Sequence, residues 1–302
     1  MTQQLVNLLT LGSVYALFAL GYSMVYGILT MLNFAHGEVF MIGGFMAYMV
    51  QQWFLDGDQL TAPPAVVILC MLVVAMAVCG ALAVAIEFFA YRPLRNAARL
   101  APLISALAMS ILLRNVVGVL THFRTRPIRT DLLLPNSMGI TIGDVTIGAD
   151  RILIIVVTAI ALIVLEIFMS RSKMGKAMRA TSQDREAASF MGISVNRVIS
   201  TTFLVGAMLA GIAGVLTGLF YTQVDFAMGF ALGMKAFTAA VLGGIGNLRG
   251  AVLGAFVLAT AETLGSYYIS FMYRDVIAFA LLIILLLFKP SGLLGKPAAV
   301  KV

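Results

Sequence analysis

Long apolar segments follow one another along almost the whole sequence and are separated by short loops. Because 61% of the 302 residues are hydrophobic and only 11% are charged, too few polar residues remain to cover the surface of a soluble domain. About 20 apolar residues in a helix are enough to cross the hydrocarbon core of a bilayer. The pattern therefore predicts an all-α, polytopic membrane protein with a single membrane domain over residues 1–302.

We expect about eight to nine transmembrane or re-entrant helices. The piece at 231–245 has about 15 residues, which is short for a full crossing, and a glycine-rich stretch at 243–250 joins it to the next piece. Nine crossings place the two chain ends on opposite sides, whereas eight would require one piece to be re-entrant. The predicted segments are 5–29, 38–54, 65–90, 101–120, 151–170, 198–221, 231–245, 250–268 and 274–289.

The distribution of Lys and Arg predicts the orientation, because basic loops stay on the cytoplasmic side. The third segment ends in three arginines, and the loop at about 171–197 carries six further basic residues. The first seven residues carry none, so the first segment does not resemble a cleaved signal peptide. We therefore expect an amino terminus outside the cytoplasm and a cytoplasmic carboxyl terminus. The loop at about 121–150 is placed on the outer side, although it contains three arginines.

The loop at about 171–197 also contains the clearest polar helix signal. Thr181 and Asp184 have the spacing of a capping box, in which a hydroxyl and an acid each satisfy a free backbone amide. This predicts a short helix from about Ser182 to Met191, with Gly192 as its left-handed stop. Two turns are not stable alone, so the helix needs its flanking spans or a partner surface.

Polar residues within or beside apolar segments are candidates for function, because ionisable groups are costly in hydrocarbon. Asn33, His36 and Glu38 lie between the first two segments, where a position at the membrane interface explains them equally well. Lys235 and Glu262 lie in the broken region, and Arg114 lies inside the fourth segment. Glu262 is a candidate partner for Arg114. We also expect the glycines at 206, 211, 214 and 218 to pack helices closely.

The sequence excludes several functions. It has no phosphate-binding loop of the G-x-x-x-x-G-K-[ST] type and no metal-spaced His or Cys set, so we expect no catalytic residues, metal site or cofactor in this chain. The basic residues occupy loops rather than a folded basic face, which argues against nucleic-acid binding. Cys70 and Cys79 are too far apart on one helix to form a disulfide.

Three motifs in this order resemble the permease subunits of branched-chain amino acid ABC importers, specifically the H-type subunit. They are LNFAHGE at 32–38, EAASFMG at 186–192 and KAFTAAVLGGIGN at 235–247, and the resemblance covers nearly the whole chain. The chain lacks the Ile and Leu-Pro that follow EAA in other ABC permeases. The resemblance implies an ABC importer permease fold that moves branched-chain amino acids from periplasm to cytoplasm by alternating access. It also implies a bacterial inner membrane, in which the amino terminus and the loop at about 121–150 are periplasmic.

The resemblance also implies partners and site residues. ATP and Mg would be bound by two cytoplasmic ATPase subunits, and a homologous second permease subunit and a periplasmic substrate-binding protein would complete the assembly in the lipid bilayer. The residues predicted to couple to the ATPase are Asp184, Arg185, Glu186, Ala187, Ala188 and Gly192. Those predicted more weakly to organise the translocation path or its gate are Asn33, His36, Glu38, Gly244 and Asn247.

Three alternatives remain open at this point. A permease of the same superfamily for urea, short amides or other amino acids would carry the same motifs. A self-contained secondary transporter or channel would need an ion site or filter at the bilayer midplane, and no carboxylate pair is placed for one. A structural scaffold would support no solute flux in any assembly.

Overall fold

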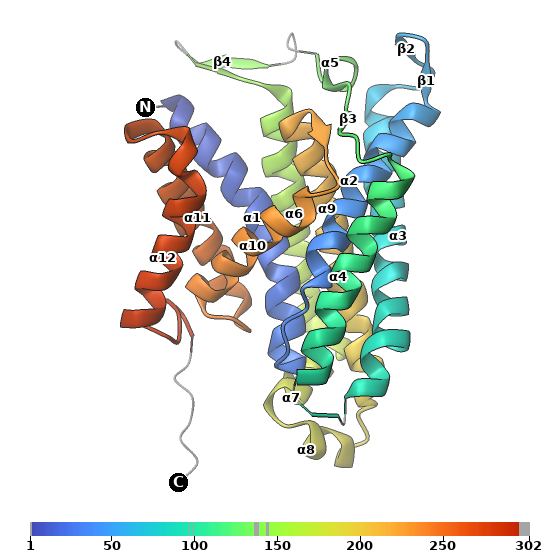
Figure 1. The fold of residues 1–302 in the computed structure, drawn as a ribbon, viewed down its shortest axis with the longest axis vertical. Helices are drawn as coiled ribbons and strands as arrows, with labels where there is room; N and C mark the ends of the chain where they lie inside the picture. The colour runs from blue at the N-terminus through green and yellow to red at the C-terminus, as the bar shows by residue number, and fades with distance from the viewer. Residues whose placement is uncertain (1, 96, 99, 136–138, 143–144, 296–302) are drawn as a thin grey trace.

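The computed structural model describes residues 2–95, 97–98, 100–135, 139–142 and 145–295. It is a bundle of long helices joined by short connections (Figure 1). Over this part of the chain, seven helices are long and apolar enough to cross a membrane. They are α1 (Thr2–Leu29), α3 (Pro64–Ile86, continued by a π-helical turn Glu87–Tyr91 and a 3₁₀ turn Arg92–Leu94), α4 (Leu100–Leu120), α6 (Ala149–Arg171), α9 (Val195–Tyr221), α11 (Leu248–Tyr268) and α12 (Arg274–Phe288, preceded by a 3₁₀ turn Phe271–Tyr273).

Two further helices, α10 and α2, are not among these seven long apolar helices. Helix α10 (Met228–Gly243) has 16 residues and is the shorter apolar helix that the sequence predicted at 231–245. It stops where Gly244 and Gly246 adopt positive φ angles of 103° and 90°, which L residues rarely adopt. Helix α2 (Ala35–Trp53) has 19 residues and is polar at both ends, yet most of it is buried. The predicted break between 231–245 and 250–268 is confirmed.

The helices sort into an inner and an outer set. In the most apolar 18-residue stretch of each helix, 89% of α1 and 78% of α9 is buried, compared with 17% of α4 and α6 and 6% of α12. Large apolar side chains of the outer helices point away from the bundle, as membrane-facing helices require. Helices α1, α2 and α9 therefore form the centre, and the others surround them.

Glycines allow the central helices to approach closely. A Cβ on Gly214 of α9 would collide with the Phe40 carbonyl of α2 and lie 2.7 Å from the Gly44 amide. A Cβ on Gly211 would lie 2.8 Å from the Ala75 carbonyl of α3. The predicted close packing at these glycines is confirmed, because backbone meets backbone where no side chain separates the helices.

Gly214→Ala is expected to lower the thermal stability of the purified protein, because neither backbone at this crossing can move without separating α2 from α9. Gly206→Ala, in the same helix, is the control. A Cβ there would meet its nearest atom at an ordinary 3.4 Å, and Ala is the better helix former by up to about 1 kcal/mol. Melting curves in detergent compare the two variants. A Gly214→Ala protein as stable as Gly206→Ala would contradict the close contact.

The connections gather at two ends of the bundle (Figure 1). At the end near the amino terminus lie the hairpin β1 (Leu55–Asp56) and β2 (Gln59–Leu60), the helix α5 (Thr130–Leu133), and the hairpin of β4 (Ile140–Ile142) and β5 (Val145–Ile147). Strand β3 (Arg126–Pro127) pairs with β6 (Gln223–Val224), which links the loop after α4 to the end of α9. The register of β4 with β5 pairs Ile140 with Ile147, and residues 143–144 lie outside the described residues.

The opposite end carries two short helices between α6 and α9. These are α7 (Lys173–Gln183) and α8 (Arg185–Phe190), and they occupy the polar loop predicted at 171–197 (Figure 1). The loop at 121–150 and the 171–197 loop therefore lie at opposite ends of the bundle, as the sequence predicts.

Candidate functional site

Helix α7, which the sequence did not predict, starts at Lys173, nine residues before the predicted helix start at Ser182. The Ser172 hydroxyl caps it by accepting a hydrogen bond from the Gly175 amide at 2.8 Å. Thr181 lies within the helix, where its hydroxyl donates to the Ala177 carbonyl at 2.8 Å. The capping box predicted at Thr181 and Asp184 is therefore wrong, because Ser172 had already started a helix that runs through Thr181.

Asp184 forms the corner between the two short helices. It ends α7 and caps α8, because its carboxylate accepts a hydrogen bond from the Ala187 amide at 3.0 Å. Helix α8 covers Arg185–Phe190 rather than the predicted 182–191. Gly192 follows with a φ of 79°, so the predicted left-handed stop is confirmed. The sequence thus predicted a short helix at the right place but with the wrong first residue.

Most of α8 faces away from the bundle. Ala188 is buried, whereas Asp184, Glu186 and Ala187 are exposed. Phe190 and Met191, which were not among the predicted coupling residues, are 89% and 83% exposed. The signal that the sequence offered was the presence of two large apolar residues side by side in a charged loop outside the predicted membrane segments. An exposed aromatic and a methionine on a short helix are typical of a docking surface.

Arg185 connects α8 to the centre of the bundle. Its Nε donates a hydrogen bond of 3.1 Å to the Ile28 carbonyl, and its second guanidinium nitrogen bonds to the same oxygen. Ile28 lies in the last turn of α1, whose final carbonyls have no partner within the helix. A displacement of α8 can therefore pull directly on α1.

One group of predicted path residues lies at the start of α2 or just before it: His36 and Glu38 are in its first turns, and Asn33 precedes it. The Tyr91 hydroxyl donates to the Asn33 side chain at 2.8 Å. His36 is buried 4.8 Å from the Tyr22 ring, measured between ring centroids, and its Nε2 has no hydrogen-bond partner among the described residues. Ser110 of α4 donates to Glu38 Oε1 at 3.1 Å. Asn33, His36 and Glu38 are thus enclosed by protein.

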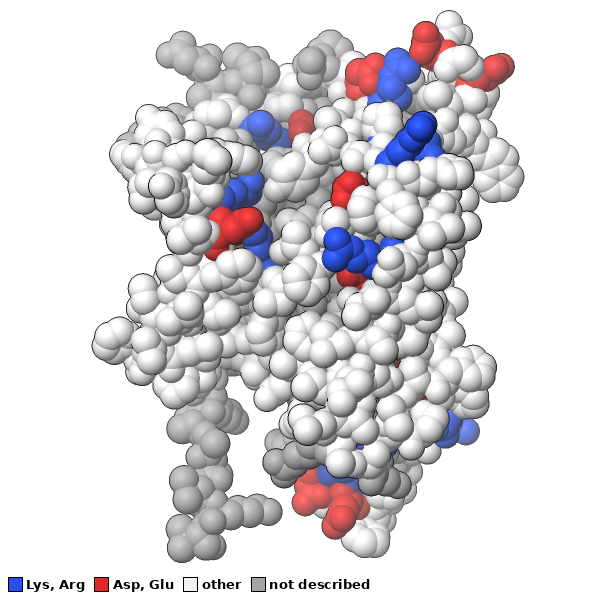
Figure 2. Space-filling view, in the orientation of Figure 1, with Lys and Arg blue, Asp and Glu red and all other residues white. Residues whose placement is uncertain are grey.

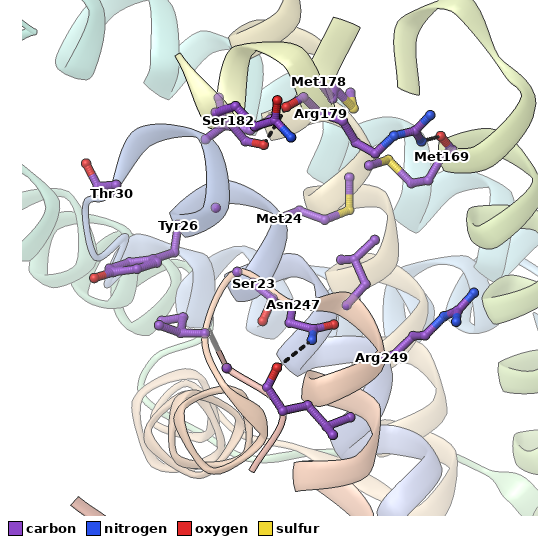
Figure 3. Close-up of a pocket in the computed structure, with 18 of the residues that line it drawn as sticks. Ser23, Met24, Tyr26, Thr30, Met169, Met178, Arg179, Ser182, Asn247 and Arg249 are labelled. Atoms are coloured by element: carbon purple, nitrogen blue, oxygen red, sulfur yellow. Dashed lines mark hydrogen bonds between the residues drawn. The ribbon is translucent and has the colours of Figure 1, made fainter. Parts of the chain in front are cut away.

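The other predicted path residues lie at the turn between α10 and α11. Gly244 ends α10, and Asn247 caps α11 by accepting from the Gly250 amide at 3.3 Å. The Asn247 side chain also donates to the Leu294 carbonyl at 2.9 Å, which ties the carboxyl-terminal segment to the turn (Figure 3). Gly37 of α2, by contrast, packs against Gly229 in the first turn of α10. The structure therefore places the two groups of path residues at opposite ends of α10.

Sequence reasoning left the roles of Lys235 and Glu262 open, and the structure joins them in a buried ionic cluster. Glu262 is fully buried and accepts a hydrogen bond from the Tyr15 hydroxyl at 2.9 Å. Its carboxylate pairs with Lys235 at 3.2 Å and with Arg274 at 2.9 Å, and Lys235 pairs with Asp275 at 2.6 Å. Figure 2 shows blue and red atoms side by side over this part of the molecule. The cluster links α1, α10, α11 and α12.

The predicted pairing of Arg114 with Glu262 is wrong. Glu262 is occupied by Lys235 and Arg274, while the Arg114 guanidinium lies over the Phe226 ring, 5.8 Å from its centroid. The cation–π contact with Phe226 lets Arg114 remain in a largely apolar segment.

Comparison with known proteins identifies the family. Residues 4–286 match the family model described as branched-chain amino acid transport system / permease component. The chain belongs to this permease family. It is 46% identical to the high-affinity branched-chain amino acid transport system permease protein BraD of Pseudomonas aeruginosa, with 99% of this chain and 97% of BraD covered. It is 44% identical to the corresponding protein LivH of Escherichia coli over the same shares of the two chains.

A more distant relative is another permease protein of a branched-chain amino acid transport system. The permease protein LivM of Escherichia coli is 29% identical over 154 residues, which cover 48% of this chain and 35% of LivM. The family match and the full-length relatives make this permease a multi-pass membrane protein and a transport component rather than an enzyme. The coupling and path residues, and the absence of a metal or cofactor, stay predictions.

Proposed function

We propose that this permease is the H-type subunit of an ATP-driven importer that moves branched-chain amino acids from the periplasm to the cytoplasm. Full-length similarity to BraD and LivH supports the solute class. The observation that carries the ATP-driven mechanism is α8, a capped helix that exposes Phe190 and Met191 at one end of the bundle and holds α1 through Arg185. Such a helix offers an ATPase a surface to bind and a contact to move.

The proposed orientation places α7 and α8 in the cytoplasm of a bacterium and the amino terminus in the periplasm. The basic residues around α7 support this assignment, because such loops stay inside. Helices α2 and α10 add to the seven long helices to give nine passages, and α10 covers only about 24 Å at 1.5 Å per residue. The carboxyl terminus is then cytoplasmic.

Three kinds of partner follow from this proposal. Two ATPase subunits bind ATP and Mg and dock on α8, a homologous second permease completes the path, and a periplasmic binding protein delivers the solute. The similarity to LivM supports the second permease, since two related permease types occur in that transport system. ATP-driven closure of the ATPases would move α8, and Arg185 would pass this movement to α1.

Alternating access then requires the bundle to rock around a central path. Asn33, His36 and Glu38 at one end of α10, and Gly244 and Asn247 at its other end, are proposed to organise the path or its gates. The close glycine contact between Gly37 and Gly229 brings the backbones of α2 and α10 together, so a movement of one helix would be passed to the other.

Reconstituted uptake tests the solute. Vesicles that contain this permease, its second permease and its ATPases are supplied with the binding protein and lumenal ATP. We expect radiolabelled leucine to accumulate against its gradient, with unlabelled isoleucine and valine as competitors. Accumulation of urea or a short amide in place of leucine would assign the permease to another solute of the superfamily. No flux of any solute would support a scaffold.

Co-purification separates the importer from a self-contained transporter. We expect the ATPases to follow the permease through detergent and to be lost from the Glu186→Arg variant, whose reversed charge lies on the exposed side of α8. Ser189→Ala, a small change at an exposed position of the same helix that is not among the predicted coupling residues, is the control. Leucine flux through vesicles that contain the permease alone would contradict the ATP-driven mechanism.

A further inference from the structure

A cavity of about 690 Å³ lies at the α7 end of the bundle, and Asn247, one of the residues proposed to organise the path or its gates, lies in its wall. The end of α1, the start of α11 and helix α7 form its walls. Figure 3 shows Arg179 and Ser182 of α7 on one side of the cavity and Asn247 and Arg249 on the other. Its lining mixes methionines with hydroxyl, amide and guanidinium groups, so it can accept an amphipathic ligand.

One hydroxyl in the cavity has no partner. Ser23 of α1 is 1% exposed and lines the cavity, and its Oγ makes no hydrogen bond with any described residue. A buried hydroxyl that is left unsatisfied costs about 1–3 kcal/mol. Ser23 therefore points to a ligand or solvent that carries a hydrogen-bonding group into the cavity.

An apolar groove continues from this cavity. It has a volume of about 300 Å³, shares Glu166, Leu248 and Arg249 with the cavity, and is otherwise lined by leucines and a valine. These lie at Leu20, Leu162, Leu165 and Val252 of α1, α6 and α11. Because α6 is one of the outer helices, the groove lies beside a helix that is largely exposed on the surface of the bundle. Polar cavity and apolar groove together have the shape and polarity of a lipid.

The charges favour an anionic headgroup. Arg249 and the amino-terminal end of α11 face the cavity, and both attract a phosphate. Arg249 pairs with Glu166 at 2.9 Å, but its side chain is 82% exposed and retains further donors for a second anion. Exposed basic residues also occur at the end of α6 and in α7, at Arg171, Lys173 and Lys176. Such clusters next to spans bind anionic lipids.

We propose that the cavity and groove form a binding site for a phospholipid with an anionic headgroup. Arg249 and the start of α11 hold the phosphate, and Ser23 donates a hydrogen bond to an ester oxygen. The acyl chain lies in the groove along Leu165 and Val252. Helix α7 forms one wall of this site and leads directly into α8. The bound lipid therefore holds α7 in place while the coupling helix α8 moves.

Lipid retention tests this site without measuring transport. The full permease complex is exchanged into nanodiscs of phosphatidylcholine with or without phosphatidylglycerol, and native mass spectrometry after mild detergent release counts bound lipids. We expect phosphatidylglycerol to be retained at one saturable site. Arg249→Gln is expected to weaken this binding about tenfold, as for the loss of a charged hydrogen bond. Val252→Trp, which fills the groove without changing charge, is expected to abolish it.

Three further variants distinguish the site from general surface effects. Arg197→Gln removes an exposed positive charge at the same end of the bundle, and Ile160→Trp adds bulk to a membrane-facing position of α6, so both should retain the lipid. Glu166→Gln frees Arg249 and removes a repelling charge, so it should increase retention.

Two results would overturn the proposal. Equal loss in Arg197→Gln and Arg249→Gln would mean surface attraction without a site, and displacement of the bound species by free leucine would mean a solute vestibule. The outcome is independent of the transported solute, because a complex that fails to take up leucine can still be tested for lipid retention.

Discussion

Replacing Phe190 with Asp is expected to remove the ATPase subunits from the purified complex and to stop ATP-dependent uptake. Phe190 is 89% exposed on α8, so the folded permease loses little when it changes. At a docked interface, an aromatic anchor of this kind commonly contributes 2 kcal/mol or more, about 30-fold in affinity. An unpaired carboxylate buried in the same contact adds a further penalty. The ratio of ATPase to permease after affinity purification measures the effect.

Phe190→Leu is the matched control for this prediction. It keeps an apolar side chain at the same position, so we expect most ATPase binding and uptake to remain. A complex of Phe190→Asp that retains its ATPases in the original ratio would show that α8 is not the docking surface, and the coupling role proposed for Arg185 would fall with it.

Glu262→Gln is expected to be the most damaging single substitution for the fold. The carboxylate is fully buried and is shared by Tyr15, Lys235 and Arg274. Removing one partner of a buried ion pair costs about 3–5 kcal/mol, because the remaining charges lose their compensation. We expect a marked fall in melting temperature and in the yield of monodisperse protein. Asp275→Asn is the control, since Asp275 is 70% exposed and water can replace the lost pair.

A second variant keeps this prediction testable if Glu262→Gln does not fold. Replacing Glu262, Lys235 and Arg274 together with methionine removes all three charges at similar volume. Buried ion pairs that are replaced as a unit by apolar residues are often tolerated. The triple variant should therefore be more stable than Glu262→Gln. If both variants melt at the temperature of Asp275→Asn, the cluster does not stabilise the bundle.

Hydropathy predicted most of the helices because a crossing requires a long apolar run, and that requirement is written locally in the sequence. The predicted segments 101–120 and 250–268 differ from α4 and α11 by no more than two residues at either end. Hydropathy predicts α2 less well, because the ends of this helix carry His36, Glu38 and two glutamines. Its burial depends on packing against α9. It placed the start of this helix at residue 38, three residues late.

The site was less predictable, because its geometry depends on contacts between distant residues. The sequence around Thr181 has the spacing of a helix cap, but in the structure Ser172 caps a helix that already contains Thr181. The sequence alone does not decide which of the two residues starts the helix. Charge alone suggested Arg114 for Glu262, whereas the fold brings Lys235 and Arg274 to that carboxylate. The hydrogen bond from Arg185 to Ile28 spans 157 residues, and no local motif predicts it.

The central position of α1 has a consequence for biosynthesis. The ribosome makes α1 first, yet α9 and α11, which contact it heavily, come much later, and Tyr15 meets Glu262 only 247 residues downstream. During translation the first helix must therefore wait in the lipid with its future contact faces uncovered. A nascent chain that ends before Glu262 cannot form the contact between Tyr15 and Glu262. Until Glu262 has been synthesised, insertion factors and quality-control proteases can therefore act on the uncovered faces of α1.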